Sequence, residues 1–260
     1  MWNITKYSFY DLIRSRWSLI YLGFYLVFTL GLLLLSRDLA QVVISLLQVI
    51  LILCPLIATI FGVMYYYNSR DFVELLLAQP LPRRSIFWGQ YLGLALSLSA
   101  SLLLGVGLPF LAFGVIGSGH GLSVLTLLVS GVVLSFVFSG LAFLIALRNE
   151  QRVRGFGLAI VLWLFFAVAY DGLLLLGLMY FREYPLETFA LGASLFNPID
   201  MARTVMLLQL DISALMGYTG AVFQRFLGSA WGMGLAAGML LVWLAWPFWR
   251  IRRVAERKDF

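Results

Sequence analysis

Charged and metal-binding side chains are scarce in this sequence of 260 residues. Only 12% of the residues are charged and 62% are hydrophobic, whereas about a quarter of a soluble domain is usually charged. This composition excludes a soluble domain. The single cysteine, Cys54, excludes an internal disulfide. Because Cys54 lies inside an apolar run, we interpret it as a small packing residue.

Lysine and histidine are nearly absent, and this limits the chemistry of the chain. The only lysines are Lys6 and Lys258, and neither follows a glycine-rich segment. A P-loop needs a lysine that reaches the terminal phosphates of ATP, so we do not expect ATP hydrolysis by that route. His120 is the only histidine, and no cysteines or paired carboxylates cluster in the sequence. We therefore expect no enzyme, no bound cofactor and no metal site in this chain, and His120 is interpreted as a solvated loop residue.

Six long apolar runs fill most of the sequence. A hydrocarbon layer about 30 Å thick needs roughly 20 apolar helical residues to cross it, and backbone groups in lipid must be satisfied within each segment. The sequence therefore predicts an all-α membrane protein, a single domain over residues 1–260 with six transmembrane helices. The predicted spans are 17–36, 42–67, 86–114, 122–147, 156–181 and 228–249.

The basic residues orient these spans. Of the 18 lysines and arginines, 14 lie before the first span, in the second and fourth connections, or after the sixth span. The four on the other side are Arg37, Arg182, Arg203 and Arg225. The positive-inside rule then places both termini in the cytoplasm. Because these charges lie at the edges of apolar runs and form no continuous face, the net charge of +6 does not indicate nucleic-acid binding.

Residues 68–79, between the second and third spans, predict a short amphipathic helix on the cytoplasmic side. Asn68 or Ser69 can cap its start, and Asp71 lies favourably in its first turn. Pro80 and Pro82 end it. Its predicted apolar stripe is Phe72, Leu75, Leu76 and Gln79, with Arg70 and Glu74 elsewhere on its surface. The helix either rests on lipid headgroups or docks another protein. Residues 2–16 form either a second surface helix or a charged flank of the first span.

The long outer segment 182–227 and the end of the fifth span hold the other polar candidates. Asn197 and Pro198 are typical of a helix start, with Asp200 near the positive end of its dipole. That helix either covers the bundle or docks a periplasmic partner. Asp171 is the one carboxylate deep in a span. With no second ionisable group nearby in the spans, it is predicted to face protein in a structural role rather than to relay protons.

Four methionines are expected near the outer face. Met179, Met201, Met206 and Met216 carry thioethers, which are soft ligands suited to Cu(I). Methionine also fills irregular apolar gaps, and no tight M-x-x-M spacing is present. We therefore predict packing rather than copper binding for these residues.

The segment after the second span resembles the coupling segment of the second-class ABC export permeases. The residues that carry this resemblance are Glu74, Leu75, Leu76, Leu77, Pro80 and Arg83, followed by Gly89, Tyr91, Leu92 and Gly93. Asp71, Phe72 and Val73 replace the Gly-Thr-Leu of that family. The resemblance implies that residues 68–79 form a coupling helix that contacts a separate cytoplasmic ABC ATPase, and that this ATPase binds ATP and magnesium.

A second resemblance lies beyond the fifth span. Residues 195–203 read LFNPIDMAR, similar to the Asn-Pro-x-Asp-x-x-Arg segment of NosY-type permeases through Asn197, Pro198, Asp200 and Arg203, and Asp171 also fits that group. The resemblance implies a homodimer in the bacterial inner membrane that exports a substrate or does conformational work on a periplasmic copper-handling protein. An exporter of a hydrophobic substrate unrelated to copper, or a passive channel or scaffold, is the alternative.

Overall fold

The computed structural model of the protein describes residues 2–36, 38–115, 121–180, 192–209 and 230–257, and in these residues it is helical without strands. Among these described residues, six helices are long and apolar enough to cross a membrane, so the predicted all-α membrane fold is confirmed. The spans are α2 (Arg16–Leu35), α3 (Leu39–Asn68), α5 (Arg83–Ala112), α6 (Gly121–Arg148), the fifth span of three consecutive segments, and α12 (Ala230–Arg257).

The fifth span changes its backbone winding half-way along. It consists of α7 (Arg152–Leu164), a π-helix (Phe165–Ala169) and α8 (Tyr170–Tyr180). Apolar periodicity gave no sign of the π-helix. The sixth span also differs from its predicted range, because α12 continues to Arg257, beyond the predicted end at residue 249. Arginine, glutamate and alanine are good helix formers, so the helix continues where the apolar run stops.

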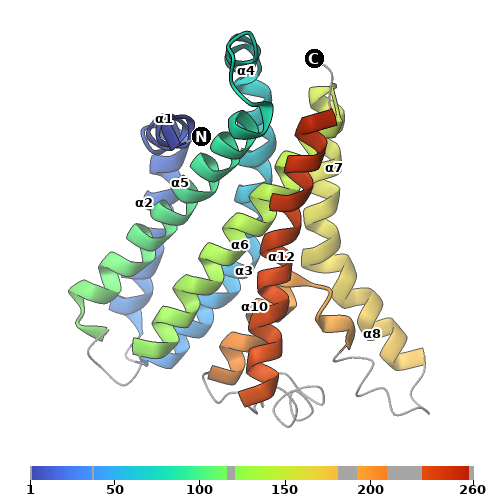
Figure 1. Ribbon diagram of the computed structural model, residues 1–260. Helices are drawn as coiled ribbons and strands as arrows, with labels where there is room; N and C mark the ends of the chain where they lie inside the picture. The colour runs from blue at the N-terminus through green and yellow to red at the C-terminus, as the bar shows by residue number, and fades with distance from the viewer. Residues whose placement is uncertain (1, 37, 116–120, 181–191, 210–229, 258–260) are drawn as a thin grey trace.

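Three short helices lie at the ends of the bundle. The helices α1 (Trp2–Ile13) and α4 (Arg70–Leu77) lie at one end, together with the last turns of α12 (Figure 1). We call this the α4 end. The helix α10 (Pro198–Gln209) lies toward the other end, which we call the α10 end (Figure 1). The predicted outer loops around Arg37 and His120, and residues 182–191 and 210–227, fall outside the described residues.

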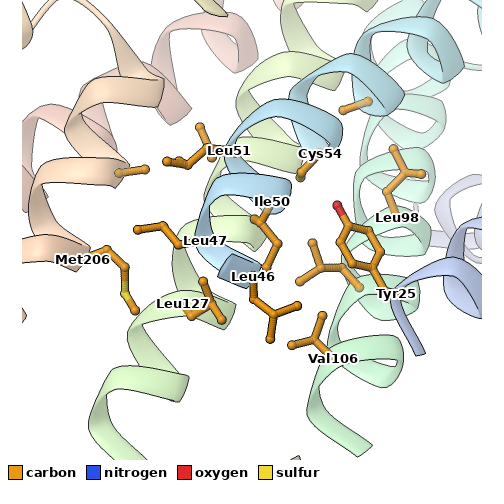
Figure 2. Close-up of a cluster of buried hydrophobic side chains, with 14 of the residues drawn as sticks. Tyr25, Leu46, Leu47, Ile50, Leu51, Cys54, Leu98, Val106, Leu127 and Met206 are labelled. Carbon is orange, nitrogen blue, oxygen red and sulfur yellow. The ribbon is translucent and has the colours of Figure 1, made fainter. Parts of the chain in front are cut away.

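The core is built around α3, α5 and α6, and α6 also contacts α7, α10 and α12. Leu46, Leu47, Ile50, Leu51 and Cys54 of α3 lie among side chains from α2, α5, α6 and α10 (Figure 2). The Cys54 thiol is fully buried, 3.0 Å from the Ser135 hydroxyl, in keeping with the predicted packing role.

The outer methionines that the structure describes do not come together. Met206 is buried in the main core cluster and Met201 in a separate cluster with Ala236, whereas Met179 is exposed. Met216 lies outside the described residues. Met201 and Met206 are therefore both buried among apolar side chains, in different clusters.

The surface helix α1 is held tightly against α5. A Cβ added at Gly93 of α5 would lie 2.5 Å from the Ser8 Cβ, and one at Gly89 would lie 2.8 Å from the Ile4 side chain. Two small residues four apart let helices approach closely in this way. The α1 helix is therefore a fixed part of the α4 end rather than a loose flank of the first span.

Candidate functional site

The helix α4 is joined to the second span by a single residue, Ser69. The Ser69 side chain makes no capping bond to α4, so the predicted cap is not formed. Its hydroxyl instead donates to the Tyr66 carbonyl at 3.3 Å and accepts from the Gln90 amide at 3.1 Å. Gln90 is fully buried on α5. A buried side chain of the third span therefore fixes the hinge between the second span and α4.

One face of α4 packs on the bundle. Val73 is buried, and Leu76 and Leu77 pack against the same apolar cluster. Of the residues in the predicted stripe, Phe72 and Leu76 are half-buried, whereas Leu75 is 69% exposed and Gln79 is also exposed. The helix has only eight residues, three of them consecutive leucines, so the apolar pattern alone did not define which side faces the bundle.

The opposite face of α4 is open to solvent. Arg70 and Glu74 form an exposed ion pair at 3.3 Å, one helical turn apart. Among the predicted coupling residues, Phe72 and Leu76 are half-buried, whereas the remaining six are exposed: Arg70, Asp71, Glu74, Leu75, Pro80 and Arg83. The exposed surface thus combines charges of both signs with one large apolar side chain, Leu75.

Two further contacts tie α4 and its hinge to other elements. The Phe72 ring stacks on Tyr7 of α1, with the ring centroids 5.2 Å apart. The Tyr67 hydroxyl donates to the carbonyl of Asn149, in the connection between α6 and α7, at 2.7 Å. Sequence reasoning missed both contacts, as it missed Gln90, because they join residues far apart in the chain.

The second polar site lies where α10 meets the fifth span. Arg203 of α10 bonds through one guanidinium nitrogen to Asp171 at 3.0 Å and to Asp200 at 3.1 Å. The expectation for Asp171 concerned ionisable groups within the spans and did not include this arginine. The cation that pairs with Asp171 comes from α10, which is outside the spans. We call Asp171, Asn197, Asp200 and Arg203 the outer cluster.

Asn197 connects the outer cluster to the backbone. The helix α10 begins at Pro198, as the sequence predicted, and the Asn197 side-chain oxygen accepts from the Ile199 amide at 3.0 Å. The Asn197 side-chain nitrogen donates to Asp200 at 3.0 Å and to the carbonyl of Phe166 at 2.9 Å. Phe166 lies in the π-helix, where the altered backbone winding changes the usual hydrogen-bond partners.

Asp200 is the most buried charged group of the outer cluster. Burial and the neighbouring Asp171 carboxylate together raise the pKa of Asp200 to about 7, although Arg203 and Asn197 act in the opposite direction. Two carboxylates that share one guanidinium repel each other, so one of them holds a proton more readily than an isolated aspartate does. The geometry supports a tie between α10 and the fifth span that responds to protonation.

Comparison with known proteins indicates the family. No protein-family profile matches the chain. A probable ABC transporter permease protein NosY from Stutzerimonas stutzeri is 26% identical over 272 residues, which covers 95% of this chain and 93% of that protein. The protein of the same name from Pseudomonas aeruginosa is 26% identical over 233 residues, covering 84% and 85%. Both matches support a NosY-type ABC transporter permease.

This similarity supports a role at the level of the whole chain. The protein is the membrane permease subunit of an ABC transporter, and such a permease works with an ATPase subunit. The match with the Stutzerimonas protein covers 95% of the chain, so it extends over both ends of the bundle.

Proposed function

We propose that the α4 end faces the cytoplasm and that α4 is the surface on which the ATPase subunit docks. The observation that carries this proposal is the two-sided arrangement of α4. One face is fixed on the bundle through Val73, while Glu74 and Leu75 project into solvent. A helix resting on lipid headgroups would turn its apolar side chains toward the membrane. Leu75 instead shares the exposed surface with an ion pair, as at a protein interface.

The hinge contacts suggest how ATP-driven movement reaches the membrane. A push on α4 is carried to α5 through Gln90 and Ser69, and to the connection before α7 through Tyr67. The stacked rings of Phe72 and Tyr7 carry the same movement into α1. Because buried polar contacts have few alternative arrangements, they transmit a displacement rather than absorb it.

We further propose a homodimer in the bacterial inner membrane that acts at the α10 end. Few residues of the fifth span are buried within one copy, which leaves much of its apolar surface to lipid and to a second copy. In this proposal a periplasmic partner at the α10 end handles copper, while Met201 and Met206 are buried among apolar side chains in separate clusters. Export of a hydrophobic substrate unrelated to copper is the second candidate, favoured by the exposed apolar surface of the fifth span.

Replacing Glu74 by Lys tests the docking surface. This change reverses a charge on the exposed face with little change in helix propensity, and like charges across an interface cost several kcal/mol. We expect normal expression of the permease and a loss of at least tenfold in the amount of ATPase subunit that co-purifies with it.

Glu150→Lys is the matched control, because Glu150 is an exposed glutamate at the same end but outside α4. We expect it to leave the complex intact. If Glu74→Lys retains the ATPase as well as the control does, α4 is not the docking surface. An equal loss in both variants would show that overall charge, not α4, governs the association.

A further inference from the structure

The last turns of α12 combine arginines with tryptophans in a regular way. The Arg253 guanidinium lies 3.7 Å from the centroid of the Trp249 ring, and the Arg250 guanidinium lies 5.7 Å from that of Trp246. Each arginine follows its tryptophan by four residues, so the two pairs stack along the helix. An arginine that lies over an aromatic face keeps the N–H groups at the edge of its guanidinium available for a carboxylate or phosphate acceptor.

Neither arginine has a carboxylate partner in the part of the chain that the structure describes. The ion pairs found there join Arg70 to Glu74, and Arg203 to Asp171 and Asp200. The N–H groups of two guanidinium groups held on indole rings at the edge of an apolar span are therefore not used by a carboxylate of the described residues and can bind an external acceptor.

An exposed apolar stripe leads from these arginines into the membrane-spanning part of α12. Leu235, Val242, Trp246 and Trp249 are all exposed, and their spacings of seven, four and three residues place them on one helix face, with Arg253 four residues further along the same face. From Val242 to Arg253 the helix rises about 16 Å. That is close to half of the roughly 30 Å hydrocarbon thickness, the depth of one leaflet.

The opposite face of α12 is fixed on the bundle, so the stripe is held in place. Trp88 of α5 stacks on Phe248 with ring centroids 4.1 Å apart, and its indole N–H donates to the Phe248 carbonyl at 3.3 Å. Pro247, Ile251 and Ala255 are buried on the same side. The position of both guanidinium groups therefore does not depend on a flexible tail.

We propose that this face of α12 is a binding site for an acidic phospholipid of the leaflet at the α4 end. The headgroup phosphate lies between the edges of Arg250 and Arg253, and an acyl chain follows Trp246 and Val242. The complementarity of charge selects this occupant, since anionic headgroups gather beside membrane-flanking arginines. The site is separate from α4, so its test does not depend on ATPase docking.

The test uses the purified full-length permease in neutral detergent, without the ATPase. The thermal shift on titration with phosphatidylglycerol is compared with that for phosphatidylcholine and, in a separate arm, with inorganic phosphate alone. We expect a preference for phosphatidylglycerol that falls about fivefold for each arginine replaced in Arg250→Gln and Arg253→Gln. Arg253→Lys keeps the charge, is the variant least expected to disturb folding, and should lose part of the preference.

Arg154→Gln is the matched control, because Arg154 is an exposed arginine that flanks the fifth span at the same end. It should keep the full preference. An equal loss in this control would show diffuse attraction by surface charge and overturn the proposal. A full shift by inorganic phosphate alone would also overturn the proposal. So would the dissociation of a dimer in the Arg250→Gln and Arg253→Gln variants without any change in lipid preference.

Discussion

Both ends of the bundle carry an arginine that pairs with carboxylates, but the two pairs differ in burial and in what they join. At the α4 end, Arg70 and Glu74 lie on one helix with side chains 52% and 56% exposed. At the α10 end, Arg203 joins two segments of the chain, and Asp200 is only 12% exposed. An exposed pair adds little to folding, whereas breaking a buried pair leaves a charge without compensation.

This difference in burial predicts that substitutions at the two ends affect different properties, docking at the α4 end and folding at the α10 end. The charges of α4 can be exchanged at little cost to the fold, so their effects should appear when a partner binds. The charges of the outer cluster hold α10 against the fifth span, so their effects should appear in the permease itself. Variants at the two ends can therefore be compared by two measurements, thermal stability and co-purification of the ATPase.

The largest effect on the permease alone is expected from Arg203→Met. This substitution keeps an unbranched apolar stem like that of arginine but removes the guanidinium, which leaves Asp171 and Asp200 facing each other without a cation. Removing one partner of a fully buried ion pair costs about 3–5 kcal/mol, and the half-exposed position of Arg203 reduces the expected cost to about 2 kcal/mol. Thermal unfolding of the purified protein should show a lower midpoint and a lower yield. A midpoint equal to that of the wild type would mean that the cluster does not hold α10.

A smaller effect is expected from pH. Because Asp200 has a pKa of about 7 in the folded protein, above that of an unfolded aspartate, the folded state binds the proton more tightly between about pH 4 and pH 7. The contribution of Asp200 to stability is therefore full below pH 4 and is lost as the pH rises through 7. Unfolding midpoints at pH 5 and pH 8 should differ by less in Asp200→Asn than in the wild type.

The Asp171→Asn variant tests how the second carboxylate of the outer cluster affects this pH dependence. The Asp171 carboxylate raises the pKa of Asp200, so its removal should move the pH-dependent window to lower pH. Arg203 keeps Asp200 as its partner in this variant, and we expect folding and assembly to be preserved. A pH profile that is identical in the wild type, Asp171→Asn and Asp200→Asn would contradict the coupling between the two carboxylates.

The sequence predicted the spans well because backbone N–H and C=O groups in lipid must be hydrogen-bonded within each segment. Six apolar runs had to be helices, and the Asn197–Pro198 step defined the start of α10 because its side-chain cap and fixed proline geometry act locally. These features depend on residues close together in the chain. The predicted docking residues of α4 likewise came from a local pattern. That pattern did not predict which side of α4 faces the bundle.

The missing features depend on contacts between distant residues. Arg203 meets Asp171 across 32 positions, and Gln90 meets Ser69 across 21. The π-helix forms in a segment of ordinary apolar residues, and Asn197 binds the Phe166 carbonyl within it from 31 positions away. The spacing of apolar residues along one helix does not predict which side chains of another helix it will contact. The contacts within the outer cluster could therefore be identified only from the positions of the helices in the structure.

The smallest effect on stability is expected from Arg70→Gln at the α4 end. Glutamine has a helix propensity close to that of arginine, and an exposed pair one turn apart contributes only about 0.3–0.5 kcal/mol. The unfolding midpoint of the permease alone should therefore stay within about 1–2 °C of the wild type, because a fraction of a kcal/mol moves the midpoint of a protein of this size by no more than that. Co-purification of the ATPase should nevertheless fall, by less than in Glu74→Lys, since a charge is removed rather than reversed. A marked loss of stability with an unchanged complex would reverse the comparison and show that the α4 pair serves the fold rather than the partner.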